Sequence, residues 1–337
     1  MYTNAIFMKR GEPMDSSFYE DQQRRRQDKR QLRRYGNLFG GGVIAFEAIS
    51  VVVVVALVLL NKLEWFESDP IFASAINGMI TILGMFLPFL LLYTFLGETA
   101  KPAVRAVLGG PYRGSRMGLT IPIGVLFCLV ANFITVFFVS FLEKAGLSLS
   151  SPELEFSFTP LGVTMGIVQI AVVPALVEEF AMRGVVMQPL RRYGDRFAIA
   201  VSAVLFAVMH GNLVQAPFAL IIGLVIGYFV VVTGSIWTGV LIHFCNNLYA
   251  VLLTMLSQYG GEDELNWIYL VVNMTILVAG AVCLAVYGMR GRKRQLCPPS
   301  TQLSGGEKAS GFFLTPGMLI VIAIAAYTSW NFMEFTR

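Results

Sequence analysis

The sequence has little charge, few cysteines and only two histidines. Charged residues make up 14% of its 337 residues and hydrophobic residues 56%, and the mean hydropathy is +0.67. This shortage of charge excludes an ordinary water-soluble protein, because several apolar runs approach or exceed the roughly 20 residues that cross a bilayer. The formal net charge is only +4, and most basic residues lie in loops and in the N-terminal segment. That distribution is typical of membrane topology, so we expect a lipid bilayer and no nucleic acid as a partner.

The four cysteines, Cys128, Cys245, Cys283 and Cys297, are scattered and form no CxxC motif. Three of them lie in apolar runs, where a cysteine usually behaves as a small hydrophobic residue. Neither a disulfide framework nor a cysteine-rich metal site is therefore predicted. The HExxH motif is also missing, which excludes an ordinary zinc protease of that class.

The N-terminal segment, residues 1–37, is polar and strongly basic. It is predicted to be a cytosolic tail that sets the orientation of the chain, with a contact to anionic lipid or nucleic acid as the alternative. The first apolar run starts at about residue 43, too late for a cleavable signal peptide, and it is long enough to remain as a span. Residues 38–337 are predicted to form one helical membrane domain, with a catalytic core at about 160–255 and no internal repeat or second soluble domain.

Nine apolar runs predict an all-α, polytopic membrane protein with about eight or nine transmembrane helices. The runs cover about 43–60, 71–97, 121–142, 161–192, 197–211, 217–232, 235–256, 267–287 and 318–335.

The loops between these runs alternate in charge. With the N-terminus in the cytosol, basic loops fall on the cytosolic side and acidic loops outside, and nine spans leave the C-terminus outside. The absence of any eukaryotic targeting feature favours a bacterial plasma membrane. The basic loops hold Lys101, Arg105, Arg113, Arg116 and 290–294, and the acidic loops hold Glu64, Glu67, Asp69, Glu153, Glu155 and 262–264.

Two adjacent glutamates, Glu178 and Glu179, lie in the fourth run and are followed by Arg183. Glu179 and Arg183 are four residues apart, so they share a helix face and are predicted to pair. Glu178 is rotated by about 100° from Glu179 and is left to face a cavity. Pro174 removes a backbone hydrogen bond one turn earlier and predicts a kink near the site. An interfacial ion pair without a chemical role is the alternative for Glu179 and Arg183.

Both histidines lie in apolar runs, each with a companion four residues away. Phe206 precedes His210, so its ring is placed to pack against that imidazole, and His243 precedes Asn247. A single histidine in an apolar helix is often only a hydrogen-bonded structural residue. Ionisable groups at membrane depth are expensive, however, and a carboxylate and two histidines in three runs of one chain indicate a functional site.

This set of residues is compatible with two kinds of hydrolytic chemistry. In the first, Glu178 is the general base that activates water, His210 orients or shares the proton, and His243 with Asn247 stabilises the tetrahedral intermediate of amide hydrolysis. In the second, Glu178, His210 and His243 hold a zinc ion with an open position for water. The residues alone leave both open, so no cofactor is assigned and zinc stays an alternative.

The order EExxxR, FxxxH and HxxxN resembles the CPBP family of intramembrane proteases, also called Abi, which includes CAAX proteases and bacteriocin-processing enzymes. The resemblance covers about residues 160–255, includes the Arg183-Gly184 pair, and is similar to the type II CAAX prenyl endopeptidases. It implies that Glu178 and His210 activate water and that His243 and Asn247 form the oxyanion hole. The family is described both as glutamate-type and as metal-dependent.

The predicted function is therefore an intramembrane endopeptidase that cleaves a membrane-associated peptide or a lipidated protein tail. Its cavity is expected among the fourth, fifth and seventh runs, opening toward the cytosolic half. One alternative is a non-catalytic membrane scaffold or bacteriocin-immunity protein that keeps the motifs for folding. Another is a proton-coupled transporter, which the lack of an internal repeat disfavours.

Overall fold

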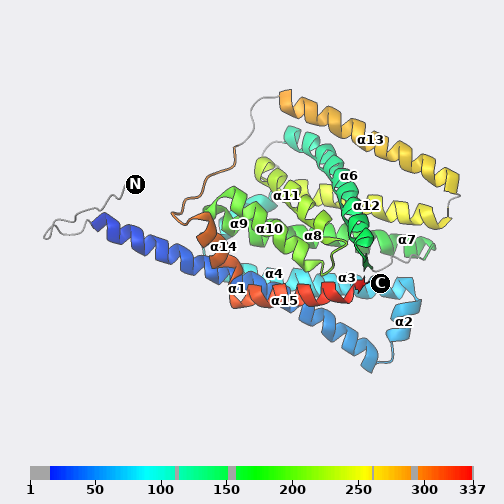
Figure 1. Cartoon of the computed structure of the whole chain (residues 1–337), viewed down its shortest axis with the longest axis horizontal. Coiled ribbons are helices and arrows are strands. Elements are labelled where there is room, and N and C mark those ends of the chain that lie inside the picture. The colour runs from blue at the N-terminus through cyan, green and yellow to red at the C-terminus, as the bar shows by residue number, and fades with distance from the viewer. Residues whose placement is uncertain (1–15, 111–113, 151–156, 260–261, 290–294, 336–337) are drawn as a thin grey trace.

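The computed structural model describes residues 16–110, 114–150, 157–259, 262–289 and 295–335, and most of them are helical (Figure 1). The helices, with π- or 3₁₀-helical segments labelled η, and two short strands are α1 (Ser16–Leu59), α2 (Leu63–Ser68), α3 (Pro70–Ile80), η1 (Thr81–Phe86), α4 (Leu87–Phe95), α5 (Lys101–Leu108), α6 (Gly114–Lys144), β1 (Leu147–Leu149), α7 (Pro160–Ile167), η2 (Val168–Val172), α8 (Val173–Glu179), η3 (Phe180–Val186), α9 (Met187–Leu190), η4 (Arg191–Tyr193), α10 (Asp195–Met209), α11 (Ala216–Thr233), α12 (Ile236–Tyr259), α13 (Glu262–Met289), α14 (Gly305–Phe313), α15 (Pro316–Asn331) and β2 (Met333–Phe335).

The all-α polytopic fold is confirmed, with fewer spans than the nine apolar runs suggested. Among the described residues, seven helical stretches are long and apolar enough to cross a bilayer, or eight if the bent pair α14–α15 is one span. The predicted fifth span is α10, whose 15 residues measure about 22 Å and fall short of a hydrocarbon core of about 30 Å. The predicted ninth span is α15 followed by β2, and α14 meets α15 at 73°.

The first helix crosses the predicted domain boundary at residue 37 without a break. Its 44 residues join the described part of the basic tail to the first apolar run, while residues 1–15 lie outside the described residues. The basic half is attached to the bundle, because Leu32 and Phe39 are fully buried and α1 packs against α14 and α15. Residues 16–37 are thus a helical extension of the first span rather than a separate loop.

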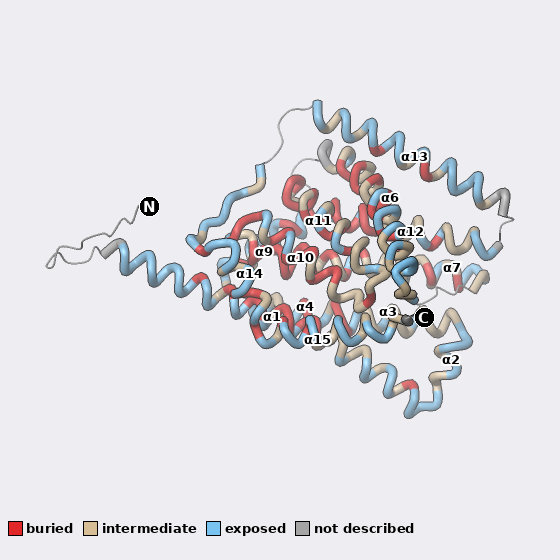
Figure 2. The backbone as a smooth tube through the Cα atoms, viewed as in Figure 1, coloured by how far each residue is buried: buried red, intermediate tan, exposed pale blue. Residues whose placement is uncertain are grey.

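Helices α10 and α11 lie at the centre of the bundle. A Cβ atom added at Gly223 of α11 would lie 2.8 Å from the Cα atom of Ala203 in α10, and such small residues let helix backbones approach closely in membranes. The most apolar window of α11 is 56% buried, against 11% for α13, and Figure 2 shows the same contrast between a buried centre and an exposed α13. The outer helices therefore offer apolar surface to lipid, while the centre holds the polar motifs.

The fourth predicted span is interrupted by two π-helical segments, η2 before α8 and η3 after it. Pro174 lies in the first turn of α8, directly after η2, at a break in the regular hydrogen-bond ladder. In η3 the carbonyl oxygen atoms of Met182 and Arg183 accept side-chain hydrogen bonds, from Ser202 at 3.0 Å and from Gln188 at 2.7 Å. These segments change the helical register on both sides of α8, so faces derived from a period of 3.6 residues do not extend across them.

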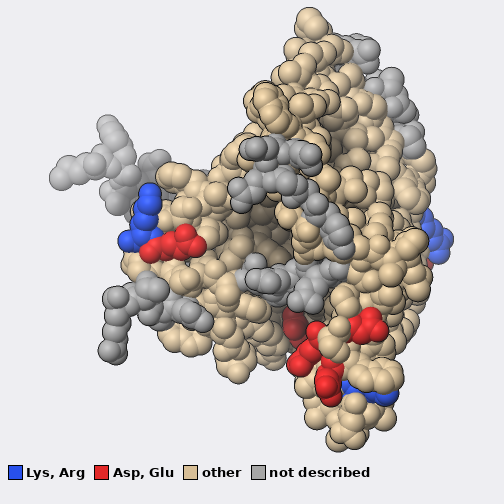
Figure 3. All heavy atoms as spheres, turned by 90° about the vertical axis from the view of Figure 1, so that its right-hand side faces the viewer, with Lys and Arg blue, Asp and Glu red and all other residues tan. Residues whose placement is uncertain are grey.

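The two ends of the bundle differ in charge. The basic half of α1 and the side chain of Arg192 lie at one end, where Arg192 pairs with Asp28. Figure 3 views the other end, where acidic side chains gather over α2 and its flanking residues. They are Glu64, Glu67 and Asp69. Strands β1 and β2 pair antiparallel, so the C-terminal strand lies beside the loop after α6. The separation of basic from acidic residues matches the predicted alternation of loop charges, while the side that each end faces stays a prediction. Arg113, Glu153, Glu155 and 290–294 lie outside the described residues.

Candidate active site

The predicted ion pair between Glu179 and Arg183 is present at the junction of α8 and η3. Glu179 Oε1 lies 3.0 Å from Arg183 Nη1, and both side chains are 0% exposed. Arg183 Nη2 donates a hydrogen bond to the carbonyl oxygen of Gly223 at 3.4 Å. The pair therefore connects the fourth span to the central helix α11 in a fully buried position.

This buried pair is not fully hydrogen-bonded. In the part of the chain that is described, Glu179 Oε2, Arg183 Nε and Arg183 Nη1 have no aligned hydrogen-bond partner, although Nη1 is within ion-pair distance of Glu179. A buried polar atom without a partner costs about 1–3 kcal/mol, and more when the group is charged. A charged pair kept at this cost is more typical of a functional site than of a purely structural contact.

His243 lies between the two glutamates. Its Nδ1 atom is 3.2 Å from Glu179 Oε1, and its Nε2 atom is 3.8 Å from Glu178 Oε2. Because a carboxylate only accepts, Nδ1 carries the proton in the first contact. The second contact is too long for a direct hydrogen bond and leaves space for an atom of a water or substrate molecule to approach both groups. Glu179 thus orients the His243 ring, a contact that was not predicted for a residue assigned to an oxyanion hole or, in the alternative, to a zinc site.

Glu178 differs from its neighbour in exposure. Its side chain is 20% exposed, whereas Glu179 is completely buried and held by two partners. The rotation expected between adjacent helical residues therefore separates the two carboxylates as the sequence predicted. Glu178 is the accessible member, with His243 at its side.

Phe206 packs against both histidines and the buried arginine. Its ring centre lies 4.9 Å from that of His210 and 5.8 Å from that of His243, both in edge-to-face geometry, and the Arg183 guanidinium carbon lies 4.7 Å from it. His210 follows the last residue of α10, and its Nδ1 atom bonds the Phe206 carbonyl oxygen at 2.7 Å. Nδ1 therefore carries the proton, and in the neutral ring the Nε2 lone pair is left to accept one.

Asn247 lies one turn after His243 on α12, as the spacing predicted. Its side-chain nitrogen donates to the carbonyl oxygen of Ile170 in η2 at 2.9 Å, and its oxygen accepts from Asn246 at 3.1 Å. The Asn247 amide is thus held by the π-helical segment η2. Its second N–H group has no hydrogen-bond acceptor among the described residues. Its role in an oxyanion hole stays a prediction.

The predicted zinc ligands do not come together. Within the described residues, no group of three or more His, Cys, Asp and Glu side chains is placed to hold a metal ion. Glu178 and His243 approach each other to 3.8 Å, but no contact joins His210 to either of them in the same part of the chain. The residues as arranged do not fit a three-ligand zinc site.

Gly239 is a site residue that the sequence motifs do not include. A Cβ atom at this position would lie 2.7 Å from Glu179 Oε2 and 2.8 Å from a methyl carbon of Ile226. Gly239 precedes His243 by four residues, so the two share a face of α12. The missing side chain therefore lets α12 approach α8 closely enough for His243 to reach Glu179. Its i, i+4 spacing from His243 is the only signal for it in the sequence.

An apolar groove lies along the same helical stretch as Glu178. It has a volume of about 370 Å³ and is lined on one side by α3 and η1, including Gly78 and Met79, and on the other by residues before the glutamates, including Gln169 and Val173. Val173 precedes Glu178 by five residues. The groove therefore lies beside the same span, and none of the predicted site residues lines it.

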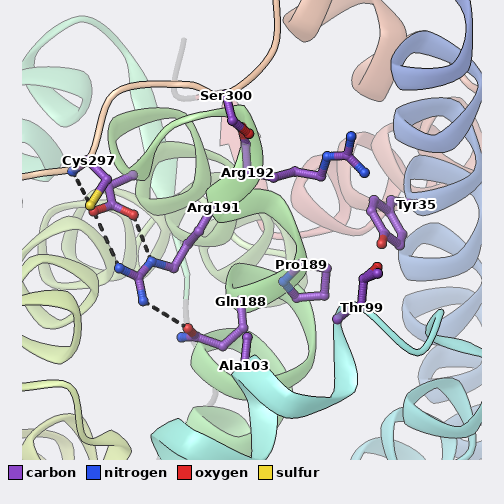
Figure 4. Close-up of a pocket in the computed structure, with 11 residues that line it drawn as sticks. Tyr35, Thr99, Ala103, Gln188, Pro189, Arg191, Arg192, Cys297 and Ser300 are labelled. Carbon is purple, nitrogen blue, oxygen red and sulfur yellow. Dashed lines mark hydrogen bonds and ion pairs between the residues drawn. The ribbon is translucent and has the colours of Figure 1, made fainter. Parts of the chain in front are cut away.

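A second cavity, of about 480 Å³, lies at the basic end of the bundle (Figure 4). Gln188 and Arg191 form part of its wall, and the Arg191 guanidinium donates to Gln188 Oε1 at 3.2 Å and to Asp195 Oδ1 at 2.7 Å. Gln188 also donates to the Arg183 carbonyl oxygen, which connects this wall to the backbone of the active-site segment. None of the predicted site residues lines this cavity.

Comparison with known proteins identifies the stretch that holds these motifs. Residues 160–249 match the model of a family described as type II CAAX prenyl endopeptidase Rce1-like. The match confirms the resemblance drawn from the three motifs, and it covers α7 to most of α12. No curated protein and no solved structure matched the chain. The family match supports a peptidase, and the candidate spans support a multi-pass membrane fold.

Proposed function

We propose that this protein is an intramembrane endopeptidase that hydrolyses a peptide bond in a membrane-associated peptide or in the tail of a lipidated protein. The observation that carries the proposal is the position of His243 between two carboxylates. Glu178 is accessible and lies beside the His243 ring, and the buried Glu179 holds that ring in place. These residues lie inside the stretch that matches a protease family.

In the proposed reaction, Glu178 is the general base. It takes a proton from a water molecule as the water oxygen bonds to the carbonyl carbon of the substrate, and the carbonyl oxygen becomes an oxyanion. The oxyanion then re-forms the carbonyl bond as the C–N bond breaks, and the proton passes from Glu178 to the leaving amine nitrogen. The products are an amine and a carboxylic acid, which ionises by giving its proton to solvent. His210, whose Nε2 lone pair can accept a proton in the neutral ring, is proposed to share this proton through an intervening water molecule, since no contact joins it to Glu178 in the described residues.

His243 and Asn247 are proposed to donate to the oxyanion. For this role the His243 ring carries a proton on Nε2 as well as on Nδ1, and the adjacent Glu179 and Glu178 carboxylates balance the resulting charge. The buried Glu179–Arg183 pair holds these groups before substrate arrives, which is the condition for strong electrostatic stabilisation of a transition state.

The substrate class follows from the surroundings of the site. The groove of about 370 Å³ is lined mainly by apolar side chains and lies along the same span as Glu178, so it suits an apolar peptide segment or a lipid chain attached to a peptide. The end with the basic residues is proposed to face the cytosol by the positive-inside rule. A bacterial plasma membrane is proposed as the location.

The test compares membranes that contain the wild type with membranes that contain Glu178→Gln. Peptide termini are mapped by mass spectrometry, with and without a strong chelator. Glu98→Gln serves as the control because Glu98 is an exposed loop carboxylate that pairs with Lys101. Loss of a general base lowers the rate by about 10²–10⁴, so termini present in wild type and Glu98→Gln are expected to vanish in Glu178→Gln. Identical termini in all three, at equal protein levels, would favour the non-catalytic scaffold. Loss under chelator would assign a metal.

A further inference from the structure

Four basic side chains on α1 are exposed and have no partner among the described residues. Two other arginines of the same helix do have partners. Arg25 pairs with Glu307 at 2.7 Å, and Arg34 donates to the Phe95 carbonyl oxygen at 3.0 Å. The last three of the four exposed residues follow the first by three, four and seven positions, so the four residues share one face of the helix. This α1 basic stripe consists of Arg26, Lys29, Arg30 and Arg33.

The contacts of α1 place the stripe at the level where the spans end. Arg34 bonds Phe95, the last residue of the candidate span Pro70–Phe95. Asp28 pairs with Arg192, one residue before the end of the candidate span Pro160–Tyr193. Positions 28 and 34 therefore lie beside the ends of two candidate spans, and the stripe extends about 10 Å along the axis. A bilayer about 40–45 Å thick with a core of about 30 Å has head-group layers of about 5–8 Å on each side, and we place the stripe at the level of one of these layers.

The stripe also lies on the side of α1 that meets lipid. Val51 follows Arg33 by 18 residues, which is about five helical turns, so the two side chains point the same way. Val51 and Val58 are exposed apolar residues of the first span, whereas Asp28 and Leu32 lie on a different face, which is buried against the bundle. The face that carries the cations at the boundary thus continues into the face that contacts the lipid chains.

We infer that the α1 basic stripe binds the anionic head groups of phospholipids in the leaflet at the basic end of the molecule. The charges are complementary, and the stripe is held in a continuous helix at head-group depth, facing away from the protein. A basic residue near an anionic membrane surface contributes about 1 kcal/mol, or roughly a fivefold change in affinity. This binding is independent of the proposed peptidase activity, because the stripe contains no site residue.

The test uses the full chain in detergent, titrated with phosphatidylglycerol or with phosphatidylcholine, and bound lipid is counted by native mass spectrometry. The neutral variant Arg26→Gln/Lys29→Gln/Arg30→Gln/Arg33→Gln is expected to bind phosphatidylglycerol at least about tenfold more weakly, with phosphatidylcholine binding unchanged. The matched control, Arg26→Lys/Arg30→Lys/Arg33→Lys, keeps the charge and is expected to bind as the wild type does. All three proteins should unfold at the same temperature, because these side chains are exposed.

Two results would overturn the inference. One is equal phosphatidylglycerol affinity in the wild type and the neutral variant. The other is binding of a polyglutamate peptide to wild-type protein in phosphatidylglycerol nanodiscs that the neutral variant loses, which would assign the stripe to an acidic polypeptide instead of lipid.

Discussion

Two clusters of paired charges lie on either side of Gln188 and are built differently. The inner cluster of Glu179, Arg183 and His243 is buried, and three of its side-chain atoms have no aligned hydrogen bond to any described residue. The outer cluster lies at the basic end, where Arg192 pairs with Asp28 and also donates to Gln31 at 2.6 Å.

The outer cluster is well satisfied and partly solvated. Arg192 is 40% exposed, and Asp195 accepts both from Arg191 and from the backbone N–H of Cys297. It connects α1, α10 and the segment before α14, which is a structural task. The inner cluster keeps its charges under conditions that reduce stability, which fits a site whose charges are needed for chemistry.

The largest effect on stability is expected when the Glu179 carboxylate of the inner cluster is removed. Glu179→Leu leaves Arg183 buried without its ion-pair partner, and breaking one member of a buried pair costs about 3–5 kcal/mol. The thermal unfolding midpoint in detergent should fall markedly, while the exposed-carboxylate control Glu98→Gln should leave it nearly unchanged. An unchanged midpoint in Glu179→Leu would contradict the assignment of Arg183 as a charge held by this residue.

The double variant Glu179→Leu/Arg183→Met removes both charges of the buried ion pair and so separates its effect on stability from its effect on cleavage. Replacing a whole buried ion pair by apolar residues is often neutral or stabilising, so the midpoint should return close to that of the wild type. Cleavage should remain absent, because His243 has lost the group that orients it. Recovery of cleavage together with stability would show that the pair has no role in the chemistry.

A smaller effect is expected from Gly239→Ala, which leaves both clusters chemically intact. The added methyl group would lie 2.7 Å from Glu179 Oε2, and such overpacking typically costs about 1–3 kcal/mol. The unfolding midpoint and the cleavage rate should both decrease. Gly41→Ala is the matched control, because nothing lies within 4 Å of a Cβ atom there. Equal effects of the two substitutions would argue against a steric role for Gly239.

The smallest effect is expected in the outer cluster. Arg192→Gln removes a partly exposed ion pair, which usually contributes about 0–1 kcal/mol. Unfolding should shift slightly and cleavage should persist, as measured by the same mapping of peptide termini. Loss of cleavage in this variant would mean that the two clusters act as one unit through Gln188.

The local part of the site could be predicted from the sequence, and the long-range part could not. The i, i+4 spacing placed Glu179 beside Arg183 and Phe206 beside His210, and both contacts occur. The contact of His243 with Glu179 depends on the close approach of α12 to α8 at Gly239, which helical periodicity does not encode.

The π-helical segments limited the prediction in a different way. They change the register on both sides of α8, so the bond from Asn247 to Ile170 in η2 could not be derived from a regular helix. The nine apolar runs exceed the seven or eight candidate spans of the described residues, since hydropathy alone does not distinguish the short central helix α10 from a complete span. The fold class followed from composition because apolar runs of this length have few alternatives in a bilayer.

The central claim is that two adjacent carboxylates have different tasks, with Glu178 active in chemistry and Glu179 holding the site. It is tested most directly by measuring cleavage and the unfolding midpoint together in Glu178→Gln and Glu179→Gln. We predict that Glu178→Gln keeps the wild-type unfolding midpoint and loses cleavage. Glu179→Gln is predicted to lower the unfolding midpoint and also to lose cleavage. Cleavage at the wild-type rate in Glu178→Gln would contradict the account.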